Sequence, residues 1–195
     1  MEIAFLFILP AALWTHSWHL MGHYSNDRAL GVVGAGVAIA LLGLVMTWQG
    51  SVIIKGSEAP LAALILAWAV YGALLAAVGI WGFDQRTLGH YGLFLALVSV
   101  IFVVYYFLGD AILLDSTEES PTKFPGQGIS TISYIMGAYA AILAAVGGLL
   151  FLHLAIPMRS IQGLVGRLFL VGAVASVVLG ALVILGLSLP SFDQL

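Results

Sequence analysis

Three histidines, in the first apolar stretch and just after it, are the side chains best suited to chemistry. His16, His19 and His23 are spaced at three and four residues, so a helix would place them on one face. A neutral imidazole both donates and accepts a hydrogen bond, so such a row could pass a small neutral polar molecule stepwise. The same rings could instead bond between helices, lie at the membrane interface or bind a metal ion. No carboxylate stands beside them in sequence, which disfavours metal, and we expect no cofactor.

Aromatic residues accompany these histidines at helical spacing. Such stripes usually serve packing. In a channel for a planar neutral solute, they could instead form a slot whose rings stack on the solute and exclude hydrated ions. The residues predicted to line a pore or solute site are Trp14, Thr15, His16, Trp18, His19, Trp68, Tyr71, Leu75, His90 and Phe94. Within this set, Thr15, His16 and His19 are predicted to exchange hydrogen bonds with the solute. A further hypothesis is an inner ring of His23, His90 and His153.

Chemistry of other kinds lacks the residues it needs. The chain has no cysteine, and it contains no nucleophile elbow, HExxH motif or phosphate loop in a fitting context. The glycines Gly31, Gly34 and Gly36 lie inside an apolar span, where they favour close helix packing. No Asp, Glu, Lys or Arg stands in the central part of any span, which disfavours ion pumps and carriers of charged substrates. We therefore do not expect an enzyme.

The composition places the chain in lipid. Residues of the hydrophobic set make up 62% of it, charged residues 8%, and the net charge is -3. A soluble domain carries about 25% charged residues, so the polar surface is too small to cover a water-soluble globule. Without a basic block, nucleic acid is not expected as a partner. The expected partner is the lipid bilayer.

Six apolar runs are long enough to cross the hydrocarbon core as helices. They cover residues 3–21, 29–48, 60–81, 88–108, 129–156 and 164–189. The predicted fold class is therefore all-α, a six-transmembrane-helix bundle that forms a single integral membrane domain over residues 1–195. The fifth run is long enough to tilt.

The loop charges predict the orientation. The short turns 22–28, 82–87 and 157–163 hold Arg28, Arg86 and Arg159, with Arg167 just beyond, whereas the opposite side has only Lys55 and Lys123. By the excess of positive charge, the short turns are cytoplasmic and both termini are external. The chain is thus predicted to form three hairpins with cytoplasmic tips. The longest loop, 109–128, is then external and acidic.

The second of these turns also resembles a known family. Gly82-Phe-Asp84-Gln-Arg86, followed by Tyr91-Gly-Leu93-Phe94-Leu-Ala96, is similar to the third-to-fourth helix turn of the urea and short-chain amide channel family (AmiS/UreI). Residues 7–22 resemble the family's first helix, and Val32-Val-Gly34-Ala-Gly36 stands where its second helix has glycines. The resemblance is best over residues 5–40 and 64–100. It implies a passive channel for urea-like amides that assembles as a hexamer. Asp84 is expected to pair with Arg86 or to cap the fourth helix.

The first hypothesis is therefore a multi-pass channel of the bacterial inner membrane. It would pass urea, a short-chain amide or ammonia through a pore in each protomer of a homo-oligomer. An alternative is an accessory or structural subunit of a membrane complex, whose glycine-rich faces bind partner helices. A third hypothesis is a membrane protein that binds metal or haem through the histidines of the first helix.

Overall fold

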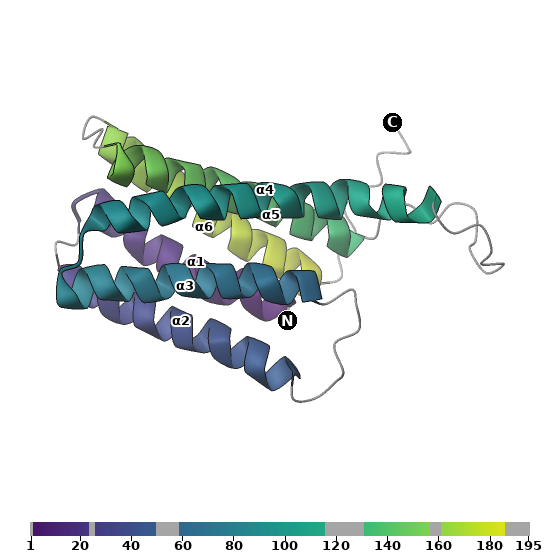
Figure 1. The fold of residues 1–195 in the computed structure, drawn as a ribbon, viewed down its shortest axis with the longest axis horizontal. Helices are drawn as coiled ribbons and strands as arrows, with labels where there is room; N and C mark the ends of the chain where they lie inside the picture. Colours follow the sequence, from purple (N-terminus) through teal and green to yellow (C-terminus); the bar gives the residue numbers. More distant parts are fainter. Residues whose placement is uncertain (1, 24–25, 50–58, 116–130, 157–160, 186–195) are drawn as a thin grey trace.

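Six long helices lie side by side along the long axis of the molecule (Figure 1). The computed structural model of the protein describes residues 2–23, 26–49, 59–115, 131–156 and 161–185, and regular structure within these ranges is helical throughout. The elements are α1 (Glu2–Leu20), α2 (Asp27–Gln49), α3 (Ala59–Trp81), α4 (Gln85–Asp115), α5 (Thr131–Leu150), η1 (Phe151–Ala155) and α6 (Gln162–Ile184). All six long helices are apolar and long enough to cross a membrane. The predicted all-α, six-helix fold is confirmed.

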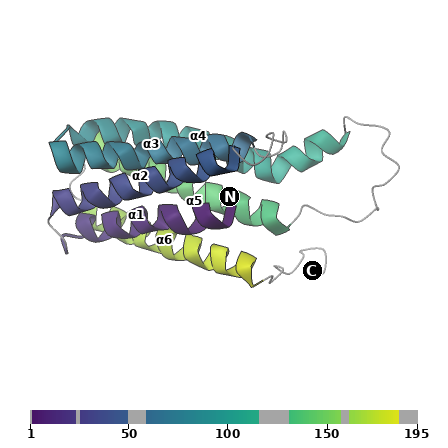
Figure 2. The same ribbon diagram turned by 90° about the horizontal axis from the view of Figure 1, so that it is seen from below.

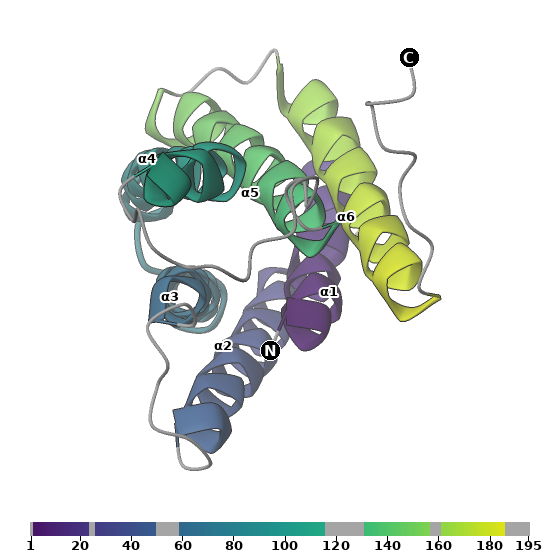
Figure 3. The ribbon, with the colours of Figure 1, turned by 90° about the vertical axis from the view of Figure 1, so that its right-hand side faces the viewer.

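The helices form three hairpins with their tips at one end of the bundle. Helices α1, α3 and α5 end, and α2, α4 and α6 begin, at the left in Figure 1, whereas α1 begins and α6 ends toward the opposite end (Figures 1 and 2). We call the end with the three connections the tip end; it is the end predicted to be cytoplasmic. Viewed along the long axis, the helices follow one another around the bundle in chain order (Figure 3).

Glycine ends the first helix before the third histidine. Gly22 has a φ of 79°. Its N–H donates to the carbonyl of His19 (2.9 Å), and the N–H of His23 donates to that of Trp18 (3.1 Å). This pair of hydrogen bonds is a Schellman motif. The side-chain contact that often accompanies the motif is made by the His23 and Trp18 rings, whose centroids are 5.1 Å apart in a T-shaped arrangement. The expected single face of three histidines is therefore wrong, because His23 lies beyond the helix.

Asp84 caps the fourth helix. Its Oδ1 accepts a hydrogen bond from the backbone N–H of Arg86 at 2.9 Å, and its carbonyl accepts one from Thr87 at 3.1 Å. Just before it, Gly82 adopts a φ of 70° and ends α3. A left-handed glycine followed by an acidic N-cap makes a tight helix–helix turn. The motif that resembles the channel family thus forms the tip of the second hairpin.

The helices pack most closely between hairpins, at the α2–α3, α4–α5 and α6–α1 interfaces. Facing glycines explain two of these contacts. A Cβ at Gly34 would lie 2.8 Å from the carbonyl oxygen of Gly72, and a Cβ at Gly147 would lie 2.6 Å from that of Gly92. Without side chains between them, the two backbones approach directly, which is how membrane helices gain packing energy when lipid supplies no hydrophobic drive.

Two adjacent glycines of α5 provide a matched test of this packing. Gly147→Ala is expected to lower the free energy of unfolding by about 1–3 kcal/mol, because its new Cβ meets the backbone of α4. Gly148→Ala meets nothing within 4 Å. Alanine there should be neutral, or should stabilise by up to about 1 kcal/mol. Unfolding in dodecyl sulfate, followed by circular dichroism, compares the two; equal stabilities would contradict the close α4–α5 packing.

Two segments differ from the sequence prediction. Helix α4 continues to Asp115, beyond the predicted end at residue 108, because hydropathy detects the membrane-crossing part of a helix rather than its last turn. The fifth helix is α-helical only to Leu150 and then becomes the π-helix η1, Phe151–Ala155. The rest of the predicted external loop, residues 116–128, lies outside the described residues. So do residues 186–189 of the sixth predicted run.

Candidate functional site

A buried hydrogen bond between two helices marks the centre of the bundle. His16 Nδ1 on α1 and the hydroxyl of Tyr71 on α3 lie 2.7 Å apart. The imidazole is 3% exposed and the phenol 0%. The two rings are stacked, with centroids 6.3 Å apart, and Phe169 of α6 places its edge against the imidazole at 5.5 Å. Three helices thus hold one imidazole in a fixed orientation.

Aromatic side chains continue from this bond toward the other end. Trp68 contacts Tyr71 edge-on at 5.4 Å, and its Nε1–H donates to Ser99 Oγ on α4 at 3.4 Å. Further along, the Tyr139 hydroxyl donates to the carbonyl of Phe5 at 3.4 Å. Trp68, Tyr71 and Tyr139 each have 0% exposed surface. A side chain without exposed surface touches no space wide enough for water, so this layer is closed in the structure.

Neutral groups supply all the buried polarity in the described part of the chain. The buried polar residues there are His16, Ser17, Ser99 and Ser176. Ser17 donates to the carbonyl of Trp14 at 2.6 Å and Ser176 to that of Gly172 at 2.7 Å. These two hydroxyls are satisfied within their own helices. The buried polar groups that bond between helices include His16 with Tyr71, Trp68 with Ser99, and Tyr139 with Phe5.

A polar cavity of about 140 Å³ lies at the tip end of the bundle. Residues from α1, α2, α3, α4, η1 and α6 form its wall, so all three hairpins contribute to it. Its deep end is formed by His16, Leu75 and Leu88, which are buried, and its rim by Asp27, Gln85 and Gln162, which are exposed. The cavity therefore opens at the tip end and ends at the His16–Tyr71 bond.

Two further imidazoles reach this cavity. His19 lies at the end of α1, with its Nε2 3.2 Å from Asp27 Oδ1 at the start of α2. His153 comes from η1, where the π turn lies directly against Gly89 of α4: a Cβ on that glycine would lie 2.5 Å from Ala155 N. Single π turns often occur at functional sites. Here the turn helps bring His153 to the same wall as His16.

Four residues predicted from the sequence do meet in the bundle. His16, Trp68, Tyr71 and Leu75 are all buried and lie on adjoining turns of α1 and α3. Of these, His16 and Leu75 line the cavity, and His19 joins them at its wall. Sequence reasoning did not select Ser99, Phe169, Asp27, Gln85 or Gln162. Ser99 alone carried a signal, as a small polar residue within an apolar span.

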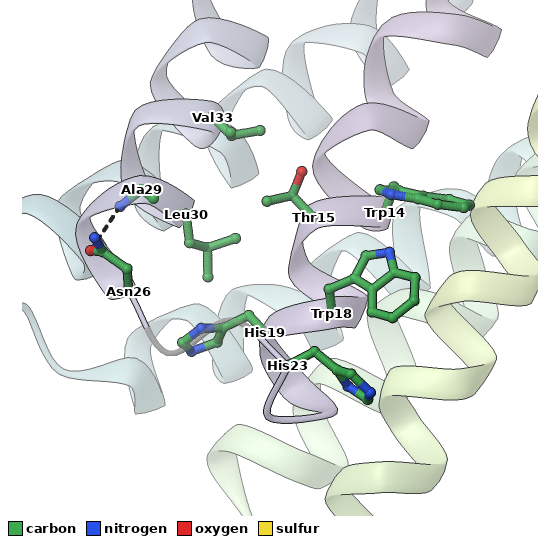
Figure 4. A pocket seen from close by; sticks show the side chains of 9 residues that line it. All are labelled: Trp14, Thr15, Trp18, His19, His23, Asn26, Ala29, Leu30 and Val33. Atoms are coloured by element: carbon green, nitrogen blue, oxygen red, sulfur yellow. Dashed lines mark hydrogen bonds between the residues drawn. The ribbon is translucent and has the colours of Figure 1, made fainter.

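The remaining predicted residues lie on the outside. Trp14, Thr15 and Trp18 line a groove of about 770 Å³ beside α1 and α2, which His19 and His23 also border (Figure 4). Thr15 donates its hydroxyl to the carbonyl of Ala11 at 2.9 Å, within its own helix. Trp14 is 46% exposed. These three residues line the outer groove and do not line the tip-end cavity.

The fourth helix turns its predicted residues outward as well. Phe94 is 51% exposed. His90 is exposed, with Nδ1 2.8 Å from the carbonyl of Arg86 in its own helix and its ring against Phe151. The hypothesis of an inner ring of His23, His90 and His153 is therefore wrong. Only His153 of the three reaches the cavity, where it joins His16 and His19. Among the described residues, no group of three or more His, Asp or Glu side chains is arranged to hold a metal ion.

The fold and site define a multi-pass membrane protein, a six-helix bundle with a polar cavity at its tip end. Neither a protein-family model nor a curated protein matches the chain. Among solved structures, the crystal structure of the urea channel from the human gastric pathogen Helicobacter pylori is similar, with a TM-score of 0.66 and 15% sequence identity. The alignment covers 95% of this chain and 99% of that one. The resemblance seen in the sequence is thus confirmed at the level of the fold.

Proposed function

We propose that the protein is a passive membrane channel for a small neutral polar solute, with urea, a short-chain amide or ammonia as the class. The solute would pass along the axis of each protomer, from the tip-end cavity past His16 and Tyr71 and then beside Trp68. The observation that carries this proposal is the polar cavity that ends at a buried, neutral hydrogen bond. The similar fold of a urea channel supports it.

The absence of buried charged side chains from the described residues favours facilitated diffusion of an uncharged solute. An ion would need buried charge or carbonyl ligands to replace its water shell. The described residues bury no Asp, Glu, Lys or Arg side chain. A neutral amide needs only hydrogen-bond partners, which an imidazole and a phenol supply in both directions. We therefore propose a channel rather than an enzyme or an ion-coupled transporter.

The outer faces suit a homo-oligomer in the bacterial inner membrane, which we include in the proposal. Large apolar side chains of α4 such as Leu97 and Ile101 are 60% and 65% exposed, so this face must lie against lipid or a second protomer. The hexamer rests on the family resemblance. Cross-linking in native membranes, followed by mass determination, measures the protomer number.

The test is solute uptake into proteoliposomes. Stopped-flow light scattering should show urea or acetamide entering faster than into empty liposomes of the same lipid and size. Uptake of the potassium and chloride ions should stay at the level of empty liposomes. Fluxes equal to those of empty liposomes for every small amide and for ammonia would end the proposal. Such a result would favour the alternative of an accessory subunit, which should co-purify with a larger complex.

A further inference from the structure

The tip-end cavity has the size of one small molecule. Its volume of about 140 Å³ gives room for roughly four water molecules at about 30 Å³ each. One urea or acetamide with a remaining water fits this space. A space this small, lined by convergent polar groups, suits one small molecule better than a wide aqueous vestibule does.

The chemistry of the wall is that of an amide-binding site. The Asp27 carboxylate and the carbonyls of Gln85 and Gln162 accept hydrogen bonds, while the glutamine amides and imidazole N–H groups donate them. A solute with both N–H donors and a carbonyl acceptor can use both sets. An acceptor-only solute of the same shape, such as acetone, leaves the carboxylate without a donor.

The charge of the wall favours a neutral solute over a cation. Asp27 is the single carboxylate among the described residues that line the cavity. Its side chain is 63% exposed and already lies 3.2 Å from His19 Nε2. Solvent therefore screens the charge of the carboxylate, and the neighbouring imidazole partly compensates it. His16 and His153 face the same space, and protonation of any of the three rings would repel a cation.

We propose that this cavity is an equilibrium binding site for one small neutral amide, held by His19, Asp27, His153 and Gln162 in front of the His16–Tyr71 bond. This inference deepens the proposed function and rests on it. The site concentrates the solute on the tip side and presents it to His16, the first imidazole of the closed layer. Its occupant is defined by paired donor and acceptor groups as well as by size.

The five histidines of the chain provide a built-in control for a binding measurement. His16, His19 and His153 line the cavity. His23 rests on Trp18 beside the outer groove, and His90 is exposed on α4. In full-length protein in nanodiscs, labelled on the histidine rings, each ring gives its own NMR signal. Single His→Gln variants assign the signals.

Acetamide, acetone and guanidinium, three molecules of one shape, are then titrated at non-denaturing concentrations. The signals of His16, His19 and His153 should follow one saturation curve with acetamide, while those of His23 and His90 shift little. The acetone concentration at half-saturation should be at least about fivefold higher than that of acetamide. The Gln162→Leu substitution should weaken acetamide binding about fivefold. Linear shifts of all five signals together, without saturation, would overturn the site. Saturation of the site by guanidinium at a lower concentration than by acetamide would overturn it as well. Binding is measured without flux, so amide uptake into proteoliposomes without saturable binding would refute this inference alone.

Discussion

Replacing His16 by leucine is expected to reduce amide flux by roughly 5- to 150-fold. Its Nδ1 lies 2.7 Å from the Tyr71 hydroxyl, and the bond closes the deep end of the cavity. A solute that passes this point must exchange its hydrogen bonds with these two groups. Leucine fills the space without a donor or acceptor, which raises the barrier by about 1–3 kcal/mol for each unsatisfied polar group.

The same substitution also affects stability, and a double variant separates the two effects. His16→Leu leaves the fully buried Tyr71 hydroxyl without its partner, at a cost of about 1–3 kcal/mol. Adding Tyr71→Phe removes the second polar group, so the stability should return close to that of the wild type while flux stays low. Stopped-flow uptake and unfolding in dodecyl sulfate measure both quantities. Unchanged flux in the single variant would remove the imidazole from the mechanism.

The fold followed from the sequence because lipid imposes simple requirements. Each span needs about 20 apolar residues and internal backbone hydrogen bonds, and six such runs are visible without any structure. The cap at Asp84 was one of two roles expected from its position before a helix, the other being an ion pair with Arg86. The π turn did not follow, because the sequence Phe151–Ala155 carries no local signal for it and its packing partner, Gly89, lies far away in sequence.

The site was predicted only in part because these helices are apolar all round. In a soluble protein, periodicity separates a buried face from a wet one. Here a tryptophan toward lipid and a tryptophan in the bundle look alike in sequence: Trp14 is 46% exposed and Trp68 0%. Both were predicted to line the path. His16 differed because a buried imidazole needs a hydrogen-bond partner inside the membrane, and Tyr71 supplies it.

Rim residues of the cavity escaped prediction for a different reason. Asp27, Gln85 and Gln162 stand at the starts of α2, α4 and α6, where polar residues are common on any helix. Only the tertiary arrangement brings the three helix starts to one opening. A sequence read one hairpin at a time cannot reveal a site built from all three hairpins.

The second large effect is expected at the closed layer, where Trp68→Ala should abolish selection by solute size. The indole touches no water-sized space, contacts Tyr71 at 5.4 Å and bonds to Ser99. Removing it leaves a void in the closed part of the proposed path. A size filter discriminates by about 1–3 kcal/mol per methylene, so the ratio of acetamide to butyramide flux should fall about tenfold or more.

Two further variants show whether this effect comes from the path itself. Trp68→Phe retains a ring and should keep most of the size selection, even if Trp68→Ala, with a cost of about 3–5 kcal/mol, folds poorly. Trp14→Ala removes an equal side chain from the outer groove and should leave the flux ratio unchanged. Uptake of the amide series into one set of proteoliposomes compares all three. A ratio that changes as much in Trp14→Ala as in Trp68→Ala would place the solute path outside the bundle, because Trp14 lines only outer pockets, beside α2 and beside α6.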